Sequence, residues 1–181
     1  MTKARTLADF NTTSIPASVL TGTLPALNGS ALTNLPVSSK TSFRVERSND
    51  QTITSGSETI VQFNATDFDT ASGWNTTTYK YTIPETGKWL IAASVFMTGG
   101  GNNTIPAGYL HIYNGNDSIQ TTGLTSNTGS LVGTIAAAAS GVFDFTQGDE
   151  ICVKAYVTAG AARVDGIGTG SQTSLSGFKI D

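Results

Sequence analysis

The sequence is poor in the residues that build most catalytic and metal sites. Among 181 residues it has one histidine, His111, and one cysteine, Cys152. A single cysteine excludes a disulfide within the chain, and the apolar neighbours Ile151 and Val153 predict a small buried side chain. Charged residues make up only 13% of the chain, against about 25% in an average soluble domain. This composition is typical of a β-rich structural protein rather than of a helical enzyme.

The sequence also lacks the features that direct a chain to nucleic acid or into a membrane. Its 10 basic and 13 acidic residues give a net charge of -3, and the basic residues form no cluster. No segment approaches the roughly 18 to 20 apolar residues of a membrane span, and the first residues do not resemble a secretory signal. We therefore expect no nucleic-acid partner, no membrane insertion and no secretory route.

The first 40 residues differ in composition from the remainder of the chain. Pro16, Pro25 and Pro36 remove backbone donors and block long helices. Between them recur apolar side chains that so short a segment cannot bury alone. These side chains are Ile15, Leu20, Leu24, Leu27, Leu32 and Leu35. We expect residues 1–40 to form an anchoring arm that docks on another protein, with a flexible linker as the alternative.

Residues 41–181 show short runs of alternating apolar and polar residues, bounded by turn residues. In residues 78–83, for example, Tyr79, Tyr81 and Ile83 fall on one side of an expected strand. Further strands are expected at residues 109–113, about 134–145, 151–157 and 174–180. Such runs at spacings of roughly ten residues are typical of a sandwich or jelly roll. The sequence therefore predicts a single all-β head.

One expected strand, residues 89–97, is apolar on both faces. The two faces consist of Trp89, Ile91, Ala93, Val95 and Met97, and of Leu90, Ala92, Ser94 and Phe96. In a sandwich of two sheets only one face of a strand meets the core. The second face is therefore predicted to be covered by a neighbouring subunit.

Four separated segments resemble, in order, the signature of the complement C1q-like globular heads. That family has Phe, five residues, then Gly-x-Tyr-x-Phe, and here Tyr81, Trp89 and Ile91 replace its three aromatic residues while the spacing is intact. The segments are Phe63-Asn64 with Tyr81, Gly87, Trp89 and Ile91; Leu110 to Gly115; Gly148-Asp149; and Gly177-Phe178. The resemblance covers about residues 43 to 181. It implies a ten-strand jelly roll of the tumour-necrosis-factor type that assembles as a homotrimer.

The arm carries a second resemblance. Residues 1–9 and 24–35 are similar to N-terminal stretches of bacteriophage fibre and virion-surface proteins. This implies a virion protein, assembled in the host cytoplasm, whose arm docks on a capsid or tail protein. The head would then stabilise the shell or adhere to a host-surface glycan. The resemblance does not distinguish a capsid decoration protein, a head fibre and a tail fibre. A free bacterial C1q-like lectin or signalling ligand is the alternative.

No catalytic or cofactor-binding residue can be assigned from the sequence, so we expect no enzyme. His111 shares a strand face with Tyr109 and Tyr113 and is interpreted as a surface or subunit-contact residue. No Gly-x-Ser-x-Gly elbow is present. Asp67 and Asp69 stand two residues apart and are the candidates for a Ca²⁺ site, against the plainer interpretation of a solvated turn.

Overall fold

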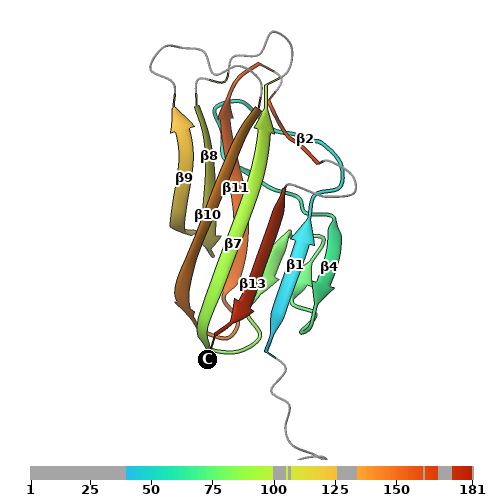
Figure 1. Ribbon diagram of the computed structural model, residues 1–181, viewed down its shortest axis with the longest axis vertical. Helices are drawn as coiled ribbons and strands as arrows, with labels where there is room; N and C mark the ends of the chain where they lie inside the picture. The colour runs from blue at the N-terminus through green and yellow to red at the C-terminus, as the bar shows by residue number, and fades with distance from the viewer. Residues whose placement is uncertain are drawn as a thin grey trace, which may run out of the picture. The chain divides into compact units, whose positions relative to one another are not determined.

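The computed structural model describes residues 40–99, 105, 107–125, 134–160, 162–166 and 173–180. All secondary-structure elements in these ranges are β-strands, and they form two antiparallel sheets (Figure 1). The same ranges contain no helix that is long and apolar enough to cross a membrane. The prediction of an all-β head is confirmed.

The first sheet is organised around the long strand β7. Its members are β1 (Ser42–Glu46), β2 (Gln51–Thr52), β4 (Ala65–Asp69), β7 (Gly87–Thr98), β10 (Thr134–Phe145), β12 (Arg163–Val164) and β13 (Ser174–Lys179). The strand order is β2-β12-β7-β13-β1-β4, and β10 pairs with β7 along its full length. In Figure 1 the strands β10, β7, β13 and β1 therefore lie side by side.

The second sheet lies behind the first in the same view. Its members are β3 (Thr59–Ile60), β5 (Trp74–Asn75), β6 (Lys80–Thr82), β8 (Ala107–Asn114), β9 (Asp117–Thr125) and β11 (Glu150–Thr158). The order is β5-β6-β11-β8-β9, and β3 also pairs with β11. A tight turn joins β8 to β9, where Gly115 has a φ of 58°, a value that glycine adopts without strain.

The core fills the space between the two sheets. Trp89 and Phe43 from the first sheet are fully buried, as is Tyr81 from the second. The rings of Phe43 and Tyr81 stack with their centroids 3.7 Å apart, so this pair joins the sheets directly. Along β7, alternate side chains from Trp89 to Met97 are buried while those between them are half-exposed. The alternation predicted for this strand is confirmed.

Two predictions about individual strands have different outcomes. The alanine-rich segment, residues 136–139, forms part of β10 as predicted. The strand expected at residues 78–83 begins only at Lys80, because Tyr79 has a φ of 56° and its N–H donates to Asn75 O at 2.8 Å. The Asn75 side chain also accepts the Thr77 N–H at 2.8 Å, which fixes a turn where alternation had predicted a strand.

Candidate functional surfaces

The outward surface of β10, β7 and β13 consists mainly of side chains that end at Cβ or one atom beyond. We call this surface the small-residue face and define its centre by Ala92, Ser94, Ala138, Ser140, Ser174 and Ser176. The strand register sets Ala138, Ser94 and Ser174 in one row and Ser140, Ala92 and Ser176 in the next. A hollow of about 310 Å³ lies over these rows. A partner could therefore approach the backbone of this sheet closely.

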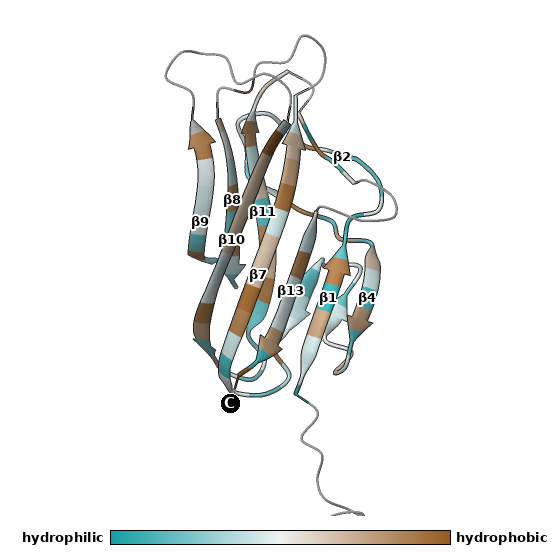
Figure 2. Ribbon diagram, viewed as in Figure 1, coloured by the Kyte–Doolittle hydropathy of each residue, from teal (hydrophilic) through white to brown (hydrophobic). Residues whose placement is uncertain are grey.

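Larger apolar side chains border the small-residue face at both ends. Val142, Leu90 and Phe178 form one row across the three strands, and Val142 and Phe178 are 56% and 42% exposed. Phe96, paired with Ala136, lies at the other end. Figure 2 shows the same strands in brown and pale tones over most of their length, with hydrophilic residues near their lower ends. The face thus combines a centre of alanine and serine with apolar residues at both ends.

The outward surface of the second sheet has the opposite character. We call it the aromatic face and define it by Tyr109, His111 and Tyr113 of β8 with Lys154 and Tyr156 of β11. The Tyr109 ring lies 5.8 Å from the Tyr156 ring at an interplanar angle of 54°, and 6.1 Å from the His111 ring. Lys154 Nζ lies 3.7 Å from the centre of the Tyr113 ring, a cation–π contact.

Glu58, just before β3, places its carboxylate over this face. Its Oε2 accepts the Tyr113 hydroxyl at 2.7 Å and lies 3.7 Å from Lys154 Nζ, and its Oε1 lies 3.8 Å from His111 Nε2. The hydrogen bond from Tyr113 is the main cause that lowers the pKa of Glu58. The same bond is the main cause that raises the pKa of Tyr113. Glu58 is therefore ionised at neutral pH.

A second hollow of about 310 Å³ opens on the aromatic face, lined by Glu58, Tyr109, His111, Thr121 and Tyr156. Thr121 Oγ1 lies 2.9 Å from His111 Nδ1, so both nitrogens of the histidine ring face named groups. The Tyr109 ring lies against β9 at Gly123, where an added Cβ would come within 2.4 Å of the ring carbon Cδ1. The glycine is required for this ring position.

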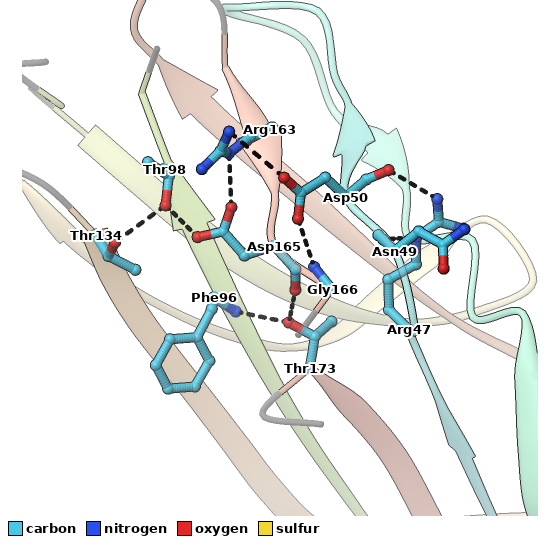
Figure 3. Close-up of polar contacts among 10 residues, drawn as sticks. All are labelled: Arg47, Asn49, Asp50, Phe96, Thr98, Thr134, Arg163, Asp165, Gly166 and Thr173. Carbon is cyan, nitrogen blue, oxygen red and sulfur yellow. Dashed lines mark hydrogen bonds and ion pairs between the residues drawn. The ribbon is translucent and has the colours of Figure 1, made fainter. Parts of the chain in front are cut away.

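A buried polar network lies at one end of the first sheet (Figure 3). The Asp165 carboxylate accepts the Arg163 Nε at 2.8 Å and the Thr98 hydroxyl, and its carbonyl accepts the Thr173 hydroxyl at 2.7 Å. Arg163 also lies 3.4 Å from Asp50. Asp165 is only 8% exposed, but each of its carboxylate oxygens accepts a hydrogen bond and one is paired with Arg163, so the network is structural.

The residues of the predicted head signature occupy structural positions. The buried members Phe63, Tyr81, Trp89 and Ile91 belong to the core cluster. Gly177 is buried against it, since an added Cβ would lie 2.7 Å from both the Ile91 and the Phe43 side chains.

The remaining members of the signature lie in a turn, at the start of a strand and in a contact between two loops. Gly148 has a φ of 94°, and Asp149 beside it accepts the Thr146 N–H at 2.9 Å. Gly87 has a φ of 149°. Asn64 accepts the Ser48 N–H at 2.9 Å. The assignment of these residues to a trimer remains a prediction, and among them only Phe178 borders the small-residue face.

The Ca²⁺ candidates are not arranged as a ligand cluster. Asp69 accepts the backbone N–H groups of Ala71 at 3.2 Å and Trp74 at 2.8 Å, which are turn contacts. Asp67 is exposed and lies 3.9 Å from Arg44. Across the described ranges no three His, Cys, Asp or Glu side chains gather as a metal site. Ca²⁺ binding by Asp67 and Asp69 remains a prediction.

Some predictions concern residues that the structure does not describe, and one site was missed. The arm residues Ile15, Leu20, Leu24, Leu27, Leu32 and Leu35 lie outside the described residues. The sequence placed His111 on one face with Tyr109 and Tyr113, but it gave no sign that Glu58 and Tyr156 join them. The alternation Lys154, Tyr156 in β11 was the available signal for part of this group.

Comparisons with known proteins establish the fold. Neither family models nor curated proteins match the chain. Among solved structures, Eiger TNF from S. frugiperda matches at a TM-score of 0.56 and 14% identity, over 78% of this chain and 93% of that chain. The globular domain of zebrafish complement 1qA protein matches at 0.55 and 14%, over 78% and 98%. Murine APRIL, in its structure at pH 8.5, matches at 0.55 and 15%, over 78% and 99%.

These matches confirm that the head has the jelly-roll fold of the tumour necrosis factor and C1q heads. At 14 to 15% identity they establish the fold alone.

Proposed function

We propose that this chain is a non-catalytic structural and binding protein whose head assembles as a homotrimer through the small-residue face. The observation that supports the proposal is the exterior of β10, β7 and β13, where small alanine and serine residues allow close approach and exposed apolar residues border them. An exposed apolar surface of this kind on a folded head is typical of a contact between proteins.

A second copy of the chain is the occupant that we propose for this face. Side chains that end at Cβ leave the sheet surface shallow, so another sheet can pack against it with few side-chain rotamers to immobilise. Ser176 Oγ lies 3.5 Å from Ala92 O, so this hydroxyl has a partner within its own sheet. The C1q-like resemblance implies threefold assembly, in which the small-residue face of each copy would meet a different surface of the next copy, so that the contacts close into a ring.

The proposal extends to the arm and to the location of the protein. Residues 1–40 would dock on a capsid or tail component of a bacteriophage virion, and the heads would project for shell stabilisation or adhesion. The similarity of residues 1–9 and 24–35 to virion-surface proteins supports this part. A free bacterial lectin or signalling ligand with the same head is the alternative, because tumour necrosis factor and complement heads share the fold.

The mass in solution tests the trimer. Analytical ultracentrifugation of the full chain is expected to give three times the 18.7 kDa of one chain. Ala138→Glu should reduce this to one chain while the circular dichroism spectrum is retained, because the interface would bury an unpaired carboxylate. Thr66→Glu is the matched control, at an exposed position of β4, and should leave the trimer intact. A monomeric full chain would refute the assembly.

Particle incorporation tests the location. Deleting residues 1–40 should leave a folded head that no longer joins the particle. Labelled antibodies should decorate purified virions carrying the full chain. Normal incorporation of the truncated protein would refute the role of the arm, and undecorated particles would favour the free ligand.

A further inference from the structure

We infer that the hollow on the aromatic face is a binding site for a neutral saccharide. The inference deepens the proposed function and rests on it for multivalent display, but the five side chains that line the hollow belong to a single copy of the chain.

The rings supply an apolar surface of fixed shape. Tyr109 and Tyr156 are directly paired across β8 and β11, and their rings lie 5.8 Å apart at 54°. This angle makes two sides of an open wedge rather than a closed stack. The C–H face of a sugar ring packs on an aromatic ring in the same way as other apolar groups. Because the Tyr109 ring lies against Gly123 and next to His111, its position is set before a ligand arrives.

The charges within the hollow favour a neutral ligand. Glu58 is the only acidic residue among the side chains that line it, and Lys154 Nζ lies 3.7 Å from its Oε2. The carboxylate is thus already compensated by a cation. Lys154 does not line the hollow, but it already neutralises much of the attraction that Glu58 would offer an organic cation, and an anion would meet the carboxylate itself. A neutral polyhydroxyl compound is repelled neither by the Glu58 carboxylate nor by the nearby Lys154 ammonium group.

Polar groups remain available to bind hydroxyls. Oε2 of Glu58 accepts the Tyr113 hydroxyl, whereas Oε1 has no donor within hydrogen-bond distance among the described residues, the nearest charged partner being His111 Nε2 at 3.8 Å. The Tyr109 and Tyr156 hydroxyls likewise form no hydrogen bond with another residue in the described ranges. An ionised carboxylate oxygen is a strong acceptor for sugar hydroxyls. The hollow thus offers apolar walls and a few polar groups, as small-ligand sites do.

The volume of the hollow limits the size of the ligand. At about 310 Å³ it falls at the lower end of the roughly 300–1,000 Å³ range of small-molecule sites. We therefore expect one or two sugar units to contact the protein, with a Kd on the order of 1 mM for a single site. Three copies of the site in one trimer would raise the apparent affinity for a surface that presents many sugars.

Protein-observed NMR of the full chain, with ligand titrations, tests the site. The probes are glucose, galactose, N-acetylglucosamine and lactose as neutral sugars, and choline as an organic cation. At least one sugar is expected to bind and to perturb amide signals of β8 and β11. Tyr156→Ala should weaken binding at least tenfold, and Glu58→Gln should weaken it several-fold. Phe68→Ala is the control, because Phe68 is an exposed aromatic residue of the other sheet, and it should not change binding.

Further variants separate folding and assembly from binding. Tyr156→Phe keeps the ring and removes the hydroxyl, so it should retain measurable binding if Tyr156→Ala merely fails to fold. Ala138→Glu, designed to yield single copies, should keep the single-site Kd while losing avidity for immobilised sugar. Binding of no neutral sugar, equal binding by Tyr156→Ala, or tighter binding of choline would each overturn the inference. A trimer that binds no sugar refutes this site alone, whereas a monomer that binds sugar refutes only the assembly.

Discussion

The two outer faces of the head share one core but differ in almost every other respect. Each has a hollow of about 310 Å³. On the small-residue face the hollow exists because Ala and Ser do not extend far above the sheet. On the aromatic face it lies between long side chains of β8, β11 and the segment before β3, with Thr121 of β9 beside them. Equal empty volumes thus arise from opposite chemistry.

The difference shows how a sandwich separates stability from recognition. The inward positions of β7 and β11 follow the same rule, in that alternate apolar residues are buried. The outward positions are free of that constraint. Short side chains there favour contact between whole sheets, and long polar and aromatic side chains favour contact with a small ligand. Changes to the core should therefore affect both faces, and changes to one face should leave the other intact.

Trp89→Ala should have the largest effect and tests whether both faces depend on one core. Trp89 is fully buried, so its removal should lower the free energy of unfolding by about 3 to 5 kcal/mol. That loss is a large fraction of the stability of an ordinary domain. Chemical denaturation followed by circular dichroism measures it. Leu124→Ala, at a residue of β9 that is 51% exposed, should change the stability little. A Trp89→Ala variant that loses trimer formation but keeps sugar binding, or the reverse, would contradict the dependence of both faces on one core.

Asp165→Asn should have an intermediate effect that is confined to the first sheet. The substitution keeps the shape of the side chain but removes its negative charge. The Asp165 side chain is 10% exposed and is paired with Arg163. We expect a loss of about 1 to 3 kcal/mol. The network holds Thr98 of β7, so trimer formation should weaken while sugar binding on the other face persists.

Asp144→Asn is the matched control for this prediction. Asp144 is 79% exposed and lies 3.1 Å from Lys88. Removing an ion pair on the surface should cost about 0 to 1 kcal/mol. Equal losses in the two variants would show that the buried network contributes no more than a surface pair.

The sequence was informative about the inside of the head and less so about its outside. The apolar run at residues 89–97 predicted β7, and the short segment that leads into the β-prone residues 142–145 predicted β10. Periodicity misplaced Tyr79, because local hydrogen bonds of Asn75 override the alternation. The outer face of β7 was identified from its apolar residues.

The aromatic face could not be assembled from the sequence. Glu58 lies some fifty residues from His111 and about a hundred from Tyr156, and only the pairing of β3, β8 and β11 brings them together. Alternation specifies which side of a strand a residue occupies, but it does not specify which strands are neighbours. A site shared by three strands therefore became visible only in the structure.

Tyr81→Phe should have the smallest effect, and it should be favourable. Tyr81 lies between the two sheets, and its buried hydroxyl has no hydrogen-bond partner among the described residues. Burial is the main cause that raises its pKa, since the charged form is disfavoured there. Phenylalanine would keep the stack on Phe43 and remove an unsatisfied polar group, so we expect a gain of about 0 to 1 kcal/mol.

The same substitution on the aromatic face should have the opposite sign. The Tyr113 hydroxyl donates to Glu58 at 2.7 Å, and Tyr113→Phe should cost about 1 kcal/mol because that bond is lost. Denaturation midpoints of the two variants, measured side by side, give the comparison directly. A loss of stability in Tyr81→Phe would mean that its hydroxyl has a partner in the folded head. The contact between the two sheets at the Phe43 stack would then be partly polar, because a hydrogen bond of the Tyr81 hydroxyl would also hold the sheets together.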